Sequence, residues 1–387
     1  MIEPYTSEQA ARYEDFKAFA TAEVAPRAET WDREQIAPVD LLPVLAKRGY
    51  FGSNLPAEFG GRGWDTVTFG LLCEALGRCS SSLAVHVTVQ TMVSMALLKW
   101  GTTEQKAKWL PPLASGKLLG AFAITEPGAG SAIESITTEF SQAHGSDDLV
   151  LNGSKKWISC AQTAGVFLVF GKSGQQAVAC LVPRESSGLQ IEPLQDMLGF
   201  RGAGLAELHF QNVKIPAANV VGKRGFALSH VAPVSLHYGR ISTACSALGL
   251  MRACFEESIA YAATRKVGDN LVGQLGIIRS LIANMGTGLE AGKLLCYEAC
   301  RAADDHSPDA FEQALVAKYF TSRAAVAAAS DAVQIRGASG CQGSSPVSRY
   351  YRDAKIMEII EGTTQVHEQL LGKMFVNRAN RLIHQSA

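Results

Sequence analysis

The sequence has no excess of charge of either sign. Its 387 residues include 36 Lys and Arg and 36 Asp and Glu, so the formal net charge is zero. Proteins that bind nucleic acid or anionic membranes draw their partners with a net positive charge. A local basic patch aside, we therefore expect neither nucleic acid nor a membrane as a partner.

Metal-binding and targeting patterns are also missing. The nine cysteines form no CxxC pair, and no Cys/His cluster has zinc spacing, so we expect no metal. The N-terminal stretch MIEPYTSEQ lacks the basic and apolar parts of a secretory signal. No apolar run approaches the roughly 20 residues of a membrane-spanning helix. These absences predict a cytoplasmic protein without a membrane span.

Residues 1–118 have the periodicity of helices. Between Ser7 and Val24, apolar side chains recur at helical spacing among charges, and Pro26 is expected to end that helix. Thr103 is the expected N-cap of a later helix, which a Pro-Pro pair closes. This zone is predicted to be an N-terminal helical domain.

Residues 119–228 change to the pattern of strands. Two apolar runs flank Asn152-Gly153, which predicts a hairpin with a type I′ turn at that pair. Further short apolar runs predict strands at 166–170, 177–182, 189–191 and 205–213. We expect an all-β middle domain here.

Residues 229–387 return to helical periodicity. Long Ala-rich segments cover 236–265, 274–305 and 308–336, and a last one at 349–381 is interrupted at Gly362. A β-domain between two helical parts is an unusual order. The fold class is therefore predicted to be mainly α with a β middle domain.

Two segments suggest a cofactor site. The segment AITEPGAGS, residues 123–131, offers backbone N–H groups and hydroxyls, as loops that bind flavin edges and phosphates do. It is not a P-loop, because no Gly-Lys-Ser/Thr follows, and its composition alone favours a plain surface loop. Trp157, two residues before Ser159, could cover a ring cofactor or equally fill a β core.

Two charged side chains are further candidates. Glu361 follows two Ile residues and precedes Gly362. In an apolar pocket its pKa would be raised, which suits a general base, and a helix-capping carboxylate is the alternative. Arg265 could clamp a pyrophosphate or match the dipole at a helix end.

Taken in order, three segments resemble the signatures of the acyl-CoA dehydrogenase family. They are AITEPGAGS at 123–131, KWIS at 156–159, and RDAK at 352–355 followed by EGT at 361–363. The resemblance covers nearly the whole chain. It implies an N-terminal helical domain, a β-barrel-like middle domain and a C-terminal four-helix bundle.

The resemblance also implies FAD as the cofactor. The positions that match the family's FAD contacts are Phe122, Ile124, Thr125, Gly130, Ser131, Trp157, Ser159, Arg265, Gln334, Gly337, Thr363 and Gln365. Gln334 and Gly337 would reach the FAD of a neighbouring subunit, which implies a homodimer or homotetramer. Positions implied for substrate binding are Ser131, His237, Arg240 and Gly362.

By the same resemblance, Glu361 is the catalytic base. It would remove the α-proton of an acyl thioester while the β-hydride moves to flavin N5. The position that some family members use instead matches Gly239, which cannot be a base. Electrons would then pass to an electron-transfer flavoprotein or another acceptor, oxygen included.

Several positions depart from the family pattern. Ala132 stands where Asp is usual, Gly276 where Gln is common, and His237 where straight-chain enzymes often carry an acidic residue near CoA. HYGR at 237–240 and KIMEIIEG at 355–362 resemble a branch that acts on acyl carrier proteins and makes hydroxymalonyl or methoxymalonyl extender units for polyketides. Three interpretations stay open: an acyl-carrier-protein dehydrogenase, a short- or branched-chain acyl-CoA dehydrogenase, and a non-catalytic flavin-binding interaction protein.

Overall fold

The computed structural model describes residues 4–385, with side chains described as far as residue 378. Residues 1–3, which begin the stretch judged to lack a secretory signal, lie outside that description. The chain opens with six α-helices: α1 (Ser7–Phe19), α2 (Ala25–Glu34), α3 (Leu42–Arg48), α4 (Thr66–Cys79), α5 (Ser81–Trp100) and α6 (Thr103–Ala114).

A seven-stranded sheet follows these helices. Its strands are β1 (Gly120–Ala123), β2 (Glu139–Gln142), β3 (Leu149–Ile158), β4 (Val166–Ser173), β5 (Gln176–Pro183), β6 (Leu189–Pro193) and β7 (Ala206–Ile215). The order across the sheet is β1-β4-β2-β3-β7-β6, with β5 paired to β4. β4 runs parallel to β1 and β2, and the remaining pairs are antiparallel.

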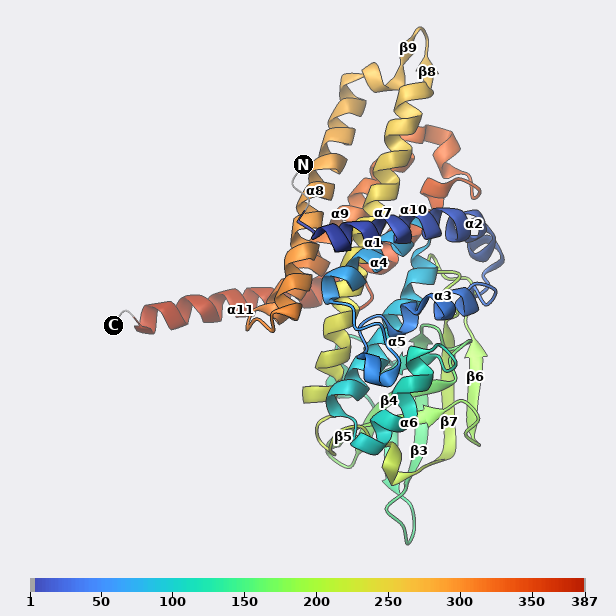
Figure 1. The fold of residues 1–387 in the computed structure, drawn as a ribbon, viewed down its shortest axis with the longest axis vertical. Coiled ribbons are helices and arrows are strands. Elements are labelled where there is room, and N and C mark those ends of the chain that lie inside the picture. Colours follow the sequence, from blue (N-terminus) through green and yellow to red (C-terminus); the bar gives the residue numbers. More distant parts are fainter. Residues whose placement is uncertain (1–3, 386–387) are drawn as a thin grey trace.

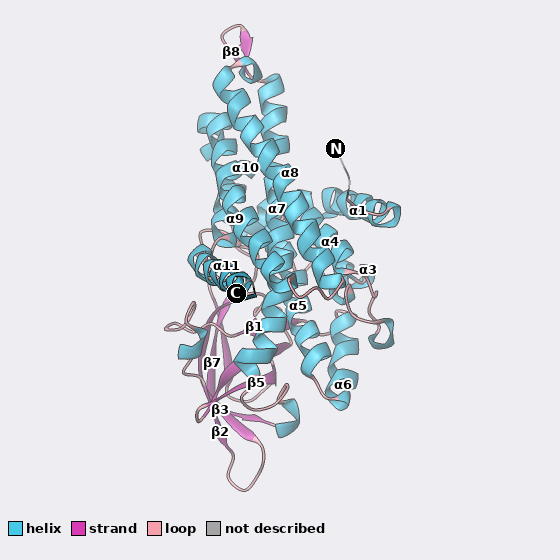
Figure 2. Ribbon diagram, turned by 90° about the vertical axis from the view of Figure 1, so that its left-hand side faces the viewer, coloured by secondary structure: helices cyan, strands magenta, loops and turns pink. Residues whose placement is uncertain are grey.

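The rest of the chain is mainly helical. Its helices are α7 (Ala232–Thr264), α8 (Gly276–Asp304), α9 (Ala310–Arg336), α10 (Pro346–Met357) and α11 (Thr364–Gln385), and the short hairpin of β8 (Lys266–Val267) and β9 (Asn270–Leu271) joins α7 to α8. α7 is the central helix, since it packs against α4, α5, α8 and α9. Figure 1 shows the sheet at one end of the molecule, the β8–β9 hairpin at the other, and α11 extending away from the body; Figure 2 separates helices from strands by colour.

The prediction of a hairpin with its turn at Asn152-Gly153 is wrong, because β3 runs unbroken through both residues. Gly153 lies at a bulge in the pairing of β3 with β7 and has φ +134°. A Cβ at this position would lie 2.9 Å from the Cα of Thr138. The glycine therefore serves a bulge and a close backbone approach, and pairing of β3 on both edges outweighs the local turn preference.

Two helix ends also differ from the prediction. Pro26 does not end the first helix: after one π-helical turn the chain enters α2, and Pro26 occupies its first turn, where a missing N–H costs little. The N-cap of α6 is Thr102 rather than Thr103, and it forms a capping box with Gln105. The Pro-Pro pair lies inside α6, which continues to Ala114.

By length and mean composition alone, α5 is apolar enough to cross a membrane, although Ser, His, Thr and Gln interrupt its apolar residues. In the fold, 89% of its most apolar window is buried inside the protein. The helix packs against α7, α6 and β1. Burial on all sides explains why its sequence is apolar all round, as expected of a core helix.

Candidate active site

Glu361 lies in the short turn between α10 and α11. Both Glu361 (φ +56°) and Gly362 (φ +98°) have left-handed backbone conformations. Such a conformation costs a non-glycine residue roughly 1–3 kcal/mol, and strained residues of this kind concentrate at functional sites. The surrounding structure therefore holds Glu361 in place.

The carboxylate of Glu361 rests on bare backbone of α7. A Cβ added at Gly239 would lie 2.3 Å from Oε2 and 2.6 Å from Cδ of Glu361. Although Glu361 as a residue keeps some exposed surface, Oε2 itself is buried and has no hydrogen-bond partner among the described residues. Burial raises the pKa of Glu361 to about 7, against the opposing effects of Arg240 and Lys318.

Two buried cations hold the backbone of this turn. Arg240 donates from Nε to the carbonyl oxygen of Glu361 at 3.3 Å, and Lys318 donates from Nζ to that of Gly362 at 2.7 Å. Burial lowers the pKa of Lys318 to about 7, although Glu361 favours its charged form. The fully buried His367 has Nδ1 3.0 Å from the carbonyl oxygen of Thr363. Burial, assisted by Lys318, lowers the pKa of His367 to about 4, so the imidazole is neutral at pH 7.

Because only a glycine leaves room for the carboxylate, Gly239→Ala is expected to displace Glu361 and to slow its proton transfer by at least about tenfold, since misplacement by about 1 Å can cost about 100-fold. The rate of flavin reduction by an acyl thioester measures this. Gly372→Ala is the matched control, because a Cβ at that position of α11 meets nothing within 4 Å. Equal rates for the two variants would contradict the seating of Glu361 on Gly239.

The loop of residues 123–131, between β1 and β2, is pinned by a buried ion pair. Glu126 accepts a hydrogen bond from Lys155 Nζ at 2.7 Å and others from the backbone N–H groups of Thr137 (2.7 Å) and Thr138 (3.0 Å). Lys155 also donates to the carbonyl oxygen of Ile124 at 3.0 Å. The loop is thus fixed to β3, while Gly130 at its far end faces open space.

Trp157 lies at the end of β3, beside this loop. Trp157 is 45% exposed as a residue, and its backbone has φ +56°, which is rare for a bulky residue. The neighbouring Lys156 donates its backbone N–H to the carbonyl oxygen of Thr125 at 3.0 Å. An exposed aromatic ring beside a pinned, glycine-bearing loop suits one face of a planar cofactor. The buried oxygen of Glu361, which has no partner among the described residues, suits a proton acceptor.

The predicted cofactor residues fall into two groups. Phe122, Ile124, Thr125, Gly130, Ser131, Trp157 and Ser159 lie on β1, on β3 or in the segments that follow these strands, and Thr363 and Gln365 lie where α11 begins. Arg265 caps α7 next to the β8–β9 hairpin, at the opposite end of the molecule from the sheet (Figure 1). Gln334 and Gly337 lie at the end of α9, which the ion pair of Arg336 with Glu257 ties to that same end of α7. One subunit therefore does not bring both groups together.

The predicted substrate residues surround the Glu361 turn in part. Arg240 donates to the carbonyl oxygen of Glu361, and Gly362 is itself part of the turn. Ser131, in contrast, is exposed in the loop of residues 123–131. His237 lies one turn before Arg240 on α7 and is half-buried. Burial, with a contribution from Arg240, lowers the pKa of His237 to about 4, so it is neutral at pH 7.

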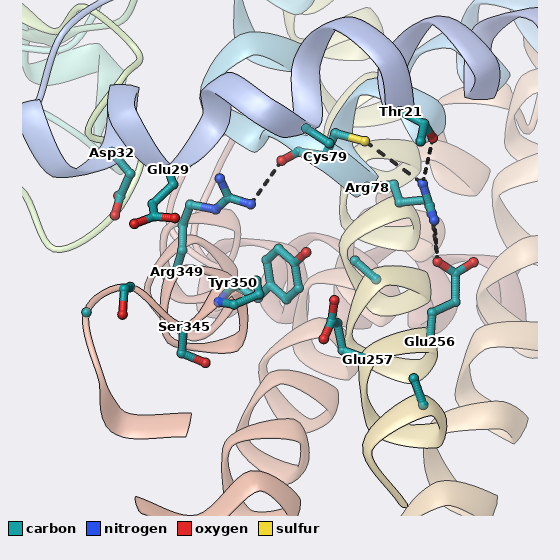
Figure 3. Close-up of a pocket in the computed structure, with 16 residues that line it drawn as sticks. Thr21, Glu29, Asp32, Arg78, Cys79, Glu256, Glu257, Ser345, Arg349 and Tyr350 are labelled. Carbon is teal, nitrogen blue, oxygen red and sulfur yellow. Dashed lines mark hydrogen bonds and ion pairs between the residues drawn. The ribbon is translucent and has the colours of Figure 1, made fainter. Parts of the chain in front are cut away.

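A cavity of about 480 Å³ lies elsewhere, between α2, the end of α4, α7 and α10. Figure 3 shows the guanidinium of Arg78 directed at Glu256 and Thr21, and Arg349 directed at the backbone of Cys79. Its charged side chains thus already have partners within the protein. The cavity does not include Glu361, so its size does not make it the reaction site.

Sequence reasoning missed three features of this site. They are the seat at Gly239, the buried pair of Glu126 with Lys155, and Lys318. Lys318 offered a usable signal, because it falls on the stripe of small and apolar residues that Ala314, Leu315 and Thr321 form at helical spacing. The other two depend on contacts between segments distant in the sequence.

Models of all three domains of one family match the chain. The N-terminal domain of acyl-CoA dehydrogenases matches residues 6–117, the middle domain residues 121–213 and the C-terminal domain residues 223–375. The chain belongs to the acyl-CoA dehydrogenase family. The predicted fold class is thereby confirmed, and the protein is an FAD-dependent oxidoreductase.

Individual relatives cover the chain almost end to end. An acyl-CoA dehydrogenase of Bacillus subtilis is 36% identical over 377 residues, which are 95% of this chain and 98% of the relative. The butyryl-CoA dehydrogenase structure from Megasphaera elsdenii is 28% identical with a TM-score of 0.92, covering 97% of this chain and 100% of that one. FkbI, for biosynthesis of the methoxymalonyl extender unit of the Fk520 polyketide, is 31% identical with a TM-score of 0.85, covering 93% and 99%.

Proposed function

We propose that this acyl-CoA dehydrogenase oxidises a small acyl group carried as a thioester on an acyl carrier protein, with Glu361 as the catalytic base. One observation carries the assignment of the base. Oε2 of Glu361 is buried against Gly239 with no partner among the described residues, and burial raises its pKa to about 7. A base with a pKa near the working pH is the most effective one.

The residues around Glu361 favour transfer of the substrate α-proton to its carboxylate. When bound, FAD supplies the acceptor for the substrate β-hydride. Glu361 takes the α-proton on Oε2, and its burial keeps water away from that oxygen. Arg240 and Lys318 hold the carbonyl groups of the turn, so the carboxylate keeps its direction as it changes charge. His237 and Ser131 are the further substrate contacts in this proposal.

The two groups of predicted cofactor residues favour a homodimer or homotetramer. We place Phe122, Ile124, Thr125, Gly130, Ser131, Trp157, Ser159, Thr363 and Gln365 at the FAD of their own subunit. Arg265, Gln334 and Gly337 would meet the FAD of a neighbour, because they lie at the far end of the molecule from Trp157 (Figure 1). An electron-transfer flavoprotein or another acceptor would take the electrons.

The carrier protein is favoured by the similarity to FkbI and by the neutral His237, which stands where an acidic residue near CoA is common in straight-chain enzymes. The second candidate, a short- or branched-chain acyl-CoA dehydrogenase, is supported by the 33% identity over 378 residues to the short/branched chain specific acyl-CoA dehydrogenase of Rattus norvegicus. The third interpretation, a non-catalytic flavin-binding protein, is disfavoured. Such a protein has no need of a glutamate in a strained backbone conformation with a buried carboxylate oxygen, which costs folding free energy.

The test is anaerobic mixing of the FAD-bound protein with one small acyl group on three carriers: acyl carrier protein, CoA and free pantetheine. We expect loss of flavin absorbance with the carrier protein and little with the other two. Loss of flavin absorbance with the acyl-CoA alone would show that the carrier is CoA and not an acyl carrier protein. If several acyl groups were tried and no thioester bleached the flavin, the dehydrogenase assignment itself would fall.

A further inference from the structure

Lys318 is a fully buried lysine in the middle of α9. Its Nζ donates to one acceptor, the carbonyl oxygen of Gly362, 44 residues along the chain. None of the ion pairs found between described residues includes Lys318. Burying an unpaired ammonium group opposes folding, and an apolar side chain of the same length would fill the space without that cost. A role beyond packing would account for a lysine here.

The bond from Lys318 acts on the turn that aims the base. Gly362 has φ +98° and follows Glu361, whose own φ is +56°. Arg240 holds the carbonyl group on one side of Gly362 and Lys318 the carbonyl group on the other. The carboxylate lies directly on α7 at Gly239, so a small rotation of the turn would lift it away.

We propose that Lys318 is a positioning residue for the base: its ammonium group fixes the Glu361-Gly362 turn and, together with Arg240, supplies positive charge beside the buried carboxylate of Glu361. The inference rests on the proposed role of Glu361. It goes beyond that role by making the protonation of the base depend on a second helix.

The other charged groups around the turn act differently from Lys318. Arg240 of α7 lowers the pKa of Glu361 more strongly than Lys318 does, and it donates to the carbonyl oxygen of Glu361 rather than to that of Gly362. His367 of α11 is neutral at pH 7, because burial lowers its pKa to about 4. Glu358, at the end of α10, is paired with Lys355 at 2.6 Å. Lys318 and Glu361 therefore form a linked pair, in which the charge on each favours the charged form of the other.

The test is the pH dependence of flavin reduction in the FAD-bound enzyme under anaerobic conditions. In the wild type the rate should rise about tenfold per pH unit below pH 7 and level off above it, since Glu361 must be ionised to act. Lys318→Met should move this rise to higher pH by about one unit or more, because a nearby opposite charge is lost. The rate at pH 6 then falls about tenfold or more.

Two further variants separate charge from packing. Lys318→Gln keeps an N–H donor but no charge, so it should shift the pH profile as Lys318→Met does, and it decides the question if the Met variant does not fold. Lys293→Met is the matched control, since Lys293 is also buried but lies on α8 and faces Tyr5. Its pH profile should equal that of the wild type.

A second measurement does not depend on turnover. Infrared difference spectra of the substrate-free, FAD-bound protein report the carbonyl stretch of a protonated carboxyl, which Glu361→Gln identifies by removing it. Its titration should move to higher pH in Lys318→Met. If the titration and the pH profile both stay at their wild-type positions, the role of Lys318 is refuted even though Glu361 stands. If Glu361→Gln still reduces flavin at the wild-type rate, the proposed function fails first.

Discussion

Glu361→Gln is expected to abolish reduction of the flavin by an acyl thioester while FAD remains bound. Glutamine has the size of glutamate, so it fits against Gly239, but it cannot accept the α-proton. General-base catalysis contributes about 10²–10⁴-fold to a rate, and a loss at the upper end of that range is expected where Glu361 has no rival. Anaerobic stopped-flow absorbance measures the rate, and the absorbance before mixing shows that the cofactor is present.

Glu298→Gln is the control for this variant, because Glu298 is a carboxylate of α8 that pairs with Arg301 on the surface. Its rate of flavin reduction should match that of the wild type. A Glu361→Gln enzyme that bleaches at the wild-type rate would exclude Glu361 as the base. A colourless variant would instead show that the residue is needed to hold FAD.

The same substitution should stabilise the protein at neutral pH. The folded-state pKa of Glu361, about 7, lies above the ordinary value of 4.5, so the folded state holds this proton more tightly than the unfolded chain. The contribution of Glu361 to wild-type stability therefore falls as the pH rises from 4.5 to 7. The glutamine of the variant does not ionise, so the unfolding temperature of Glu361→Gln should exceed that of the wild type more at pH 8 than at pH 5.

The types of the elements were predictable from the sequence wherever one periodicity covers a long stretch. The long helices α7, α8 and α9 fall on the three Ala-rich segments, with ends shifted by a few residues. The local turn signal at Asn152-Gly153 failed for a physical reason. β3 pairs with β2 on one edge and β7 on the other, and these two ladders bond its backbone on both sides of the glycine.

Only those parts of the site that lie in one short segment of the sequence were predictable. Glu361 and Gly362 stand next to each other in a recognisable segment, and so does the loop that holds Glu126. The contacts that make Glu361 a base come from α7 and α9, and no spacing rule relates Gly239 or Lys318 to position 361. Such pairings follow from the packing of α7 against α9, which the sequence pattern does not specify.

Lys155→Met is expected to cause the largest loss of stability among the changes considered. The side chains of Lys155 and Glu126 are 0% and 4% exposed, and their ion pair is 2.7 Å long. Burial would raise the pKa of Glu126, but hydrogen bonds from Lys155, Thr138 and Thr137 outweigh it and lower the pKa to about 2. The variant thus leaves a buried carboxylate charged, which costs roughly 3–5 kcal/mol of unfolding free energy. Denaturant unfolding of the FAD-bound protein measures it.

Lys156→Met is the matched control, one residue further along β3. Lys156 pairs with Glu207 at 3.0 Å, but both side chains are partly exposed, at 31% and 15%. Partly solvated pairs contribute about 0–1 kcal/mol, so the control should unfold almost as the wild type does. A loss for Lys155→Met no larger than this would show that the pair does not hold the loop.

The location of the pair connects stability with the cofactor. Lys155 joins Glu126 and the carbonyl group of Ile124 to the strand that carries Trp157. Without it, the backbone bond from Lys156 to Thr125 is left to hold the loop against this strand, so the loop is less firmly fixed beside the indole ring and FAD should dissociate more readily. The double variant Lys155→Met/Glu126→Gln removes the stranded charge and should recover part of the unfolding free energy. It should not recover the affinity for FAD, because the side-chain link from Lys155 to the loop is still missing.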